Sequence, residues 1–213
     1  MRGMGRILGS TIVGSCCLAA GLGSPAGAIA LESGAPLTET LVFVRHGEKP
    51  QQGLGQIKCQ GMNRALALPR VLIDRYGKPD YIFAPDPARQ THDPGGYADY
   101  LRPLATIEPT AVFLGLPVNT QFGFDDIDAL QAELLRPRYA HALIFIAWEH
   151  AKAEQVARAL TSAEGIAVPR WESADFDSIY VVRIDTDGTS RHARFEHAME
   201  GLNGLSQECA FAR

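Results

Sequence analysis

The chain has 213 residues, of which 46% are apolar and 21% are charged, a composition and length that indicate one globular domain with a sizeable core. Twenty-four acidic and 20 basic residues give a formal net charge of −4. The one local run of basic residues is short, so the charge pattern excludes an extended nucleic-acid interface and we expect no nucleic-acid partner.

The first 30 residues have the layout of a secretory signal peptide. Two arginines precede an apolar stretch over residues 7–23, and small residues at 26–28 offer a cleavage site. Four glycines interrupt the apolar stretch, whereas a membrane-spanning helix needs about 20 continuous apolar residues. We therefore expect an exported protein, periplasmic or secreted, with no stable membrane span once the leader has been cleaved.

The chain after the leader divides into a linker and a domain. Residues 31–40 are polar and contain both Gly and Pro, which is typical of a linker. We expect a signal peptide at 1–30, this linker, and one folded domain over 41–213. Lipoprotein anchoring at Cys16 is a second interpretation of the leader, but the apolar stretch continues past this cysteine and so favours simple export.

Two cysteines remain after removal of the leader. Cys16 and Cys17 lie inside it, which leaves Cys59 and Cys209 in the folded domain. One disulfide is possible in an oxidising compartment. The spacing alone does not decide whether the two pair.

Short apolar runs alternate with helical stretches along the domain. Three runs without helical period are typical of strands buried on both faces of a parallel sheet: 41–44, 80–84 and 142–148. Helical spacing occurs between and after them, at 62–76, 103–114 and 151–160. Two further runs, 178–184 and 191–195, flank a glycine turn and predict a hairpin. This order predicts an α/β three-layer sandwich with a mainly parallel central sheet.

Two of the predicted strands run directly into histidines. Arg45 and His46 follow the first strand, and Glu149 and His150 follow the third. In open parallel sheets, ligands bind beyond the carboxyl ends of the strands. We therefore expect both histidines at the same mouth of the sheet.

The residues at the end of the first strand suit phosphoryl transfer. Neutral imidazole is a competent nucleophile, and a phosphohistidine intermediate divides hydrolysis into two easier steps. The guanidinium of Arg45 can hold phosphate oxygens with two donors at once. Gly47 would let the backbone pass close to the phosphate.

The segment Val44-Arg45-His46-Gly47-Glu48 resembles the signature of the histidine phosphatase superfamily, which includes phosphoglycerate mutases, acid phosphatases and phosphohistidine phosphatases. The resemblance implies a phosphoglycerate mutase-like fold, phosphorylation of His46, and phosphate binding by Arg45. It also implies a reaction without metal or cofactor, and the remaining histidines show no metal-ligand spacing.

Two arginines compete for the role of second phosphate ligand. The family places an Arg at a helix start, four residues before a Thr and further before a Gly-Leu-Pro-Val turn. Arg102, Thr106 and the turn at 115–118 match that order, so we assign the role to Arg102. The alternative is Arg89, which follows the strand at 80–84 in a loop that also resembles the family's. If Arg102 is correct, residues 85–101 form a longer loop than usual, with Arg89 on its rim.

The second family histidine corresponds to His150, which would donate hydrogen bonds to the transferred phosphoryl group. The proton donor to the leaving group is harder to place, because Ala151 stands where one branch of the family has Asp. The other branch uses a Glu in the loop after the Gly-Leu-Pro-Val turn, and here that loop contains aspartates only. Asp126 is the first candidate, Asp125 and Glu149 are alternatives, and a site without a dedicated acid is a further possibility.

These features predict a phosphomonoester hydrolase that acts through phospho-His46 on a small-molecule phosphomonoester or other phosphorylated substrate. The alternative is an exported phosphate-ligand-binding protein of the same fold with little or no turnover. A pocket can bind phosphate without the acid that expels the leaving group, so the missing acid motifs support that alternative.

Overall fold

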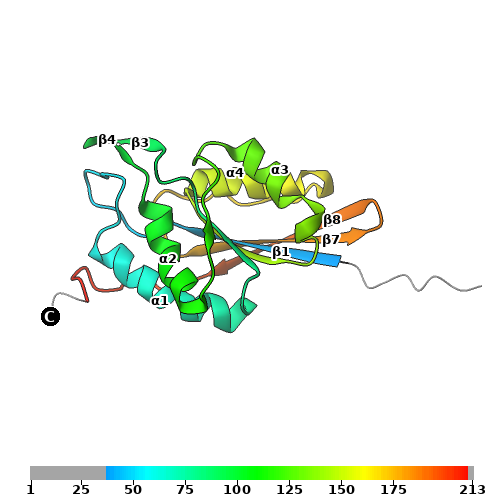
Figure 1. Cartoon of the computed structure of the whole chain (residues 1–213), viewed down its shortest axis with the longest axis horizontal. Coiled ribbons are helices and arrows are strands. Elements are labelled where there is room, and N and C mark those ends of the chain that lie inside the picture. Colours follow the sequence, from blue (N-terminus) through cyan, green and yellow to red (C-terminus); the bar gives the residue numbers. More distant parts are fainter. Residues whose placement is uncertain (1–36, 211–213) are drawn as a thin grey trace, which may run out of the picture. The chain divides into compact units, whose positions relative to one another are not determined.

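Six strands form the central sheet, in the spatial order β5-β2-β6-β1-β7-β8 (Figure 1). The computed structural model describes residues 37–210, so the predicted signal peptide at 1–30 and the start of the linker lie outside the described residues. The strands are β1 (Leu37–Arg45), β2 (Tyr81–Phe83), β5 (Val118–Asn119), β6 (Leu143–Trp148), β7 (Ser178–Asp187) and β8 (Ser190–Met199). β1 begins at Leu37, so the last residues of the predicted linker belong to the sheet.

The sheet is parallel over four strands and antiparallel at one edge. β5, β2, β6 and β1 run parallel, whereas β7 pairs antiparallel with β1 and with β8. The predicted terminal hairpin therefore exists and closes the sheet on the side of β1. The mainly parallel sheet is confirmed.

Helices cover both faces of the sheet, as the three-layer prediction requires (Figure 1). They are α1 (Cys59–Tyr76), α2 (Arg102–Leu114), α3 (Ile127–Leu134) and α4 (His150–Thr161), with short 3-10 turns at Pro137–Tyr139 and Ser162–Glu164. Successive residues of β1 face opposite layers. Leu41 and Phe43 pack with α3 and α4, whereas Val42 and Val44 pack with α1 and α2. This two-sided burial explains why the strand is apolar without alternation.

A small two-stranded sheet lies apart from the central one. β3 (Gln90–Asp93) and β4 (Gly96–Asp99) form an antiparallel hairpin between β2 and α2. This hairpin occupies the region where the sequence predicts a loop longer than usual.

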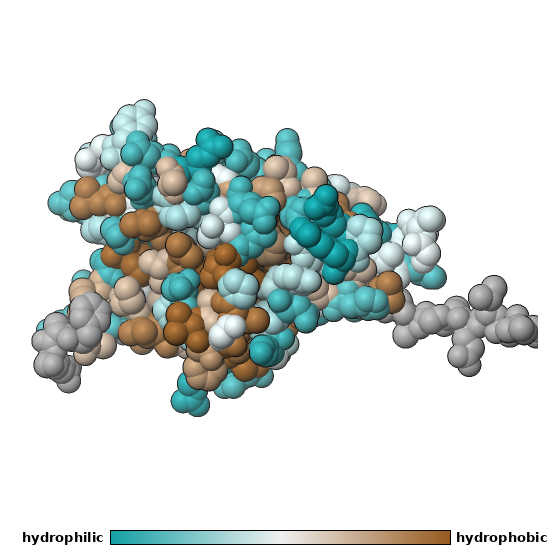
Figure 2. Space-filling model, in the orientation of Figure 1, coloured by the Kyte–Doolittle hydropathy of each residue, from teal (hydrophilic) through white to brown (hydrophobic). Residues whose placement is uncertain are grey.

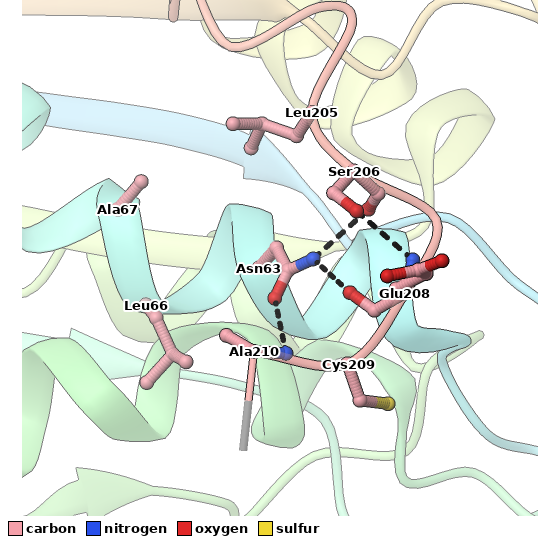
Figure 3. A pocket seen from close by; sticks show the side chains of 8 residues that line it. All are labelled: Asn63, Leu66, Ala67, Leu205, Ser206, Glu208, Cys209 and Ala210. Atoms are coloured by element: carbon pink, nitrogen blue, oxygen red, sulfur yellow. Dashed lines mark hydrogen bonds between the residues drawn. The ribbon is translucent and has the colours of Figure 1, made fainter. Parts of the chain in front are cut away.

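The C-terminal segment is fastened to α1. A disulfide joins Cys59, the first residue of α1, to Cys209. On the next turn, the Asn63 amide donates to the carbonyls of Ser206 and Glu208 at 2.9 and 2.8 Å (Figure 3). A pocket of about 530 Å³ lies between the two segments and is lined in part by Leu66.

The outer faces of α1 and α2 carry apolar side chains. Figure 2 shows apolar surface over this part of the molecule, and Leu66, Val112 and Phe113 are exposed on the two helices. Within residues 37–210, none of the helices is long and apolar enough to cross a membrane.

Candidate active site

The two histidines follow neighbouring parallel strands, as expected. Arg45 and Trp148 pair in the register between β1 and β6. One residue further on, the N–H of His46 donates to the carbonyl of Trp148 at 3.1 Å. His150 begins α4 two residues after Trp148. The carboxyl ends of β1 and β6 therefore bring His46 and His150 to the same edge of the sheet.

His46 is buried, with 3% of its surface exposed, and its Nδ1 lies 2.8 Å from the carbonyl oxygen of Gly47. A carbonyl can only accept, so Nδ1 carries the proton and the neutral ring has a free lone pair on Nε2. Burial lowers the pKa of His46 to about 3; the Gly47 carbonyl opposes this change, and the charges of Arg45 and Arg102 add to it. The ring of His46 is thus neutral near neutral pH, with its proton on Nδ1.

Arg45 is anchored through one end of its guanidinium. Its Nη1 donates to the carbonyls of Ser173 and Asp175 at 2.8 and 2.7 Å, and its Cζ lies 3.8 Å from the centre of the Phe176 ring. Its buried Nε has no hydrogen-bond partner among the described residues. Burial lowers the pKa of Arg45 to about 10, partly opposed by the carboxylate of Glu149, so the group stays charged at neutral pH.

Gly47 is packed against Gly61 and hydrogen-bonded to Thr106. A Cβ at this position would lie 2.8 Å from Cα of Gly61, so the absence of a side chain allows the loop to pack against α1. The N–H of Gly47 donates to Oγ1 of Thr106 at 2.8 Å. Glycine at this position therefore has a packing role that the sequence did not reveal, while its approach to phosphate stays a prediction.

The spacing of Arg102 and Thr106 also has a structural reason. Thr106 lies one turn after Arg102 on α2 and donates its hydroxyl to the Arg102 carbonyl at 2.8 Å. Oγ1 of Thr106 in turn accepts from the N–H of Gly47, the residue after His46. Thr106 thus couples the start of α2 to the loop after β1, which brings the charge of Arg102 close enough to act on His46.

Arg102 is buried, with 4% exposure, and is held by an acid that the sequence analysis missed. The carboxylate of Asp93, at the end of β3, accepts from both Nη atoms of Arg102, at 2.5 and 3.3 Å. The N–H of Gly55 donates to the same carboxylate at 3.0 Å, and Lys49 lies 3.5 Å away. The buried Nε of Arg102 has no partner among the described residues.

Tyr100 is a second residue that the sequence analysis missed. Its ring lies edge-on to that of His46, with centroids 6.2 Å apart, and 4.8 Å from Cζ of Arg102. Only 1% of its surface is exposed, and its hydroxyl has no hydrogen-bond partner in the described part of the chain. The only sequence signal for it was its position two residues before Arg102.

Arg89, the rival arginine, lies on the surface. Its side chain is 65% exposed, and its guanidinium is 3.9 Å from Oδ2 of Asp126. Arg89 is therefore exposed, whereas Arg102 is buried, and the choice of Arg102 as phosphate ligand stays a prediction.

The first candidate for the acid, Asp126, is the exposed partner of Arg89. Its side chain is 44% exposed, and its Oδ2 accepts from the N–H of Gly123 at 2.9 Å. The alternative Asp125 lines a surface pocket of about 330 Å³ together with Asp126 itself. The contacts of both aspartates are thus with the outer loop and not with the buried arginines.

Glu149 and His150 form a pair at the start of α4. One oxygen of Glu149 caps the helix by accepting from the N–H of Lys152 at 3.0 Å, and the other contacts Nδ1 of His150. Burial would raise the pKa of Glu149, but the hydrogen bond and charge of His150, with two backbone N–H groups, lower it to about 2. Glu149 is therefore ionised near neutral pH and orients His150.

Glu48 ties the loop that carries His46 to helix α1. It binds Arg64 of α1 at 2.8 Å, and this fully buried arginine also binds Asp177 and Glu200. One arginine thus joins the loop after β1, the start of β7 and the end of β8. No group of three or more His, Cys, Asp or Glu residues in the described region is arranged to hold a metal ion.

Neither a protein-family model nor a curated protein sequence matches the chain. Among solved structures, it is similar to one titled mycobacterial hydrolase 2, with 14% identity and a TM-score of 0.53 over 75% of this chain and 89% of that one. It is also similar to mycobacterial glucosyl-3-phosphoglycerate phosphatase Rv2419c in complex with inorganic phosphate, with 15% identity and a TM-score of 0.52 over 74% and 95% of the two chains. At these identities the likeness shows that the chain shares the fold of these two proteins, and nothing beyond the fold.

Proposed function

We propose that this chain, which has the fold of the histidine phosphatases, is a metal-independent phosphomonoester hydrolase with His46 as its nucleophile. The observation that carries the proposal is the neutral ring of His46, whose Nδ1 is engaged by Gly47 and whose Nε2 lone pair is free beside Arg45 and Arg102. A free imidazole nitrogen near two buried cations is what attack on a phosphate dianion requires.

The geometry of both arginines supports phosphate binding. Each guanidinium is fixed by protein acceptors on Nη atoms, Arg45 by carbonyls and Arg102 by Asp93, and each keeps a buried Nε–H without a partner. A buried donor without an acceptor is costly, so a site that leaves two of them beside a nucleophile is suited to an anion with several oxygens. Anchoring both side chains beforehand reduces the reorganisation needed in the transition state.

The proposed reaction has two steps. Nε2 of His46 attacks phosphorus while the bond to the ester oxygen breaks, which yields phospho-His46 and the alcohol. Water then attacks phosphorus, the phosphorus–nitrogen bond breaks, and inorganic phosphate leaves. Arg45 and Arg102 stabilise the charge on the phosphoryl oxygens, and His150, oriented by Glu149, donates hydrogen bonds to the same group.

The candidates for donating the proton to the leaving oxygen are Asp126, then Asp125 and Glu149, with a site that lacks a dedicated acid as the remaining alternative. Glu149 is ionised and engaged by His150 and the helix start. Asp126 is exposed on the rim, where a bound ester could reach it. We therefore keep Asp126 as first candidate and expect esters with good leaving groups to be the better substrates.

We also propose that the protein is exported. The layout of residues 1–30 supports export, and so does the disulfide between Cys59 and Cys209, because disulfides persist mainly in oxidising compartments. The substrate would then be a phosphorylated compound outside the cytoplasm.

The test is a phosphatase screen of the purified mature chain against a panel of phosphomonoesters. The panel includes a phosphoglycerate ester, because one solved structure of this fold is a glucosyl-3-phosphoglycerate phosphatase. His46→Ala should abolish turnover, and acid-labile label from a labelled ester should appear on the wild type alone. His141→Ala, at an exposed histidine, is the matched control and should keep full activity.

Two results would contradict the proposal. Full activity in His46→Ala would remove this residue as nucleophile. Stoichiometric binding of inorganic phosphate by the wild type, without turnover of any ester, would instead favour the alternative of an exported phosphate-binding protein.

A further inference from the structure

Tyr100 is held rigidly beside the nucleophile. It lies between β4 and α2, and its N–H is fixed by the carbonyls of Pro87 and Arg89 at 3.0 and 3.2 Å. Its ring meets the edge of the His46 ring, and a third aromatic ring, that of Phe124, lies 5.0 Å from it. A tyrosine packed on these sides has little freedom to turn its hydroxyl elsewhere.

The hydroxyl group itself is not explained by the fold. Phenylalanine would fill the same space, yet the oxygen is buried, and its hydroxyl hydrogen has no acceptor in residues 37–210, because the neighbouring guanidinium of Arg102 can only donate. Buried tyrosine hydroxyls elsewhere in this domain are bonded: Tyr139 donates to Glu133 at 2.9 Å and Tyr180 donates to the carbonyl of Pro169 at 3.0 Å. Because a buried hydroxyl normally has a partner, the acceptor for Tyr100 is expected to be a ligand.

The charges around Tyr100 indicate what kind of ligand that is. Arg102 lies against its ring, and the unpartnered Nε atoms of Arg45 and Arg102 belong to the same buried site. Burial raises the pKa of Tyr100, partly opposed by the charge of Arg102, so the phenol keeps its proton near neutral pH. The hydroxyl is therefore a permanent donor in a site built for an anion.

We infer that the hydroxyl of Tyr100 donates a hydrogen bond to a non-bridging oxygen of the phosphoryl group that His46 attacks. This inference rests on the proposed function and adds a third donor to those of Arg45 and Arg102. The three donors come from β1, from the residue after β4 and from α2, so they can meet different oxygens of one phosphoryl group. Tyr100 would then stabilise the transition state for formation of phospho-His46 and for its hydrolysis.

Tyr100→Phe removes only the hydroxyl, and Tyr139→Phe is the matched control at a buried tyrosine that bonds Glu133. The rate of phospho-His46 formation would be measured with nitrophenyl phosphate and with an alkyl phosphate, together with the inhibition constant of inorganic phosphate. We expect Tyr100→Phe to slow phosphorylation by about ten- to a hundredfold with both esters and to weaken phosphate binding. Tyr139→Phe should leave these values unchanged.

Thermal unfolding separates this role from a structural one. Since the Tyr100 hydroxyl has no acceptor in the described part of the chain, Tyr100→Phe should melt close to or above the temperature of the wild type, whereas Tyr139→Phe should melt below it. Unchanged phosphorylation in Tyr100→Phe would overturn the inference. So would a loss confined to the alkyl ester, because the hydroxyl would then serve the leaving oxygen. If the wild type neither turns over esters nor binds phosphate, the proposed function itself fails.

Discussion

Asp93 binds Arg102 end-on, with its two carboxylate oxygens 2.5 and 3.3 Å from the two Nη atoms of the guanidinium. Hydrogen bonds from Arg102 and Gly55 outweigh burial and lower the pKa of Asp93, so the acid is ionised and the pair is fully charged. The contact leaves Nε of Arg102 without a protein partner. Asp93 is therefore placed to orient Arg102 while one edge of the guanidinium remains for a phosphate oxygen.

Asp93→Asn should reduce phosphatase activity through the position of Arg102. The neutral amide cannot hold both Nη atoms, so we expect kcat/KM to fall by roughly tenfold or more, with weaker binding of inorganic phosphate. Asp99→Asn, an exposed change on the paired strand β4, is the control and should have little effect. Tighter phosphate binding in Asp93→Asn would mean that Asp93 competes with phosphate for Arg102.

The two candidates for the second phosphate-binding arginine, Arg102 and Arg89, should behave differently when each is replaced. Arg102 is buried beside Asp93, whereas the side chain of Arg89 is 65% exposed. Loss of a preorganised phosphate ligand costs on the order of a hundredfold in rate, so Arg102→Ala should be nearly inactive. Arg89→Ala should change mainly KM. An inactive Arg89→Ala beside a nearly normal Arg102→Ala would reverse the assignment.

The candidate acids can be separated by leaving group. Protonation matters for an alkyl ester and little for an aryl ester, so Asp126→Asn should slow alkyl phosphate hydrolysis selectively. Glu149→Gln should slow both esters by similar factors, because it removes the carboxylate that orients His150 and caps α4. The rate of phospho-His46 formation is the quantity to compare. Equal losses on both esters in Asp126→Asn would remove Asp126 from the role, and a selective loss in Glu149→Gln would transfer it to Glu149.

The lowered pKa of His46 should make the stability of the fold depend on pH. Its folded pKa is about 3 and its unfolded value is near 6.5, so between these values the unfolded chain binds a proton that the folded chain does not. Stability should therefore fall as the pH drops through this window, by at most about 1.4 kcal/mol per pH unit from this residue. His46→Gln should remove that contribution in urea unfolding at pH 7 and pH 5.

The ring of His46 should meanwhile stay neutral in the folded protein. Nitrogen chemical shifts of the imidazole should report the Nδ1–H form at both pH 7 and pH 5, because the Gly47 carbonyl accepts from Nδ1. A ring that takes up a proton near pH 6.5 would contradict both the buried position and the proposed resting state of the nucleophile.

The sequence by itself determined five strands of the central sheet, the helices α1, α2 and α4, and the two histidines at the strand ends, but not β5, α3 or the β3–β4 hairpin. Buried parallel strands are apolar and lack helical period, and so residues 41–44 and 142–148 could be recognised from local composition alone. Because ligands meet the carboxyl ends of such strands, the positions of His46 and His150 also followed. The spacing of Arg102 and Thr106 was recognised from the resemblance to the family, and the structure shows that it spans one helical turn.

Only the tertiary structure decided what surrounds those residues. Asp93 reaches Arg102 because residues 90–99 fold into a hairpin, in a stretch that the sequence predicted as a loop. Tyr100 meets His46 across more than fifty positions of the chain, and the disulfide from Cys59 to Cys209 spans 150 positions. Local periodicity carries no information on contacts of that range, because they depend on how loops cross between the layers. The contacts that hold Arg45 and Arg102, and the position of the Tyr100 hydroxyl, therefore follow only from the folded domain.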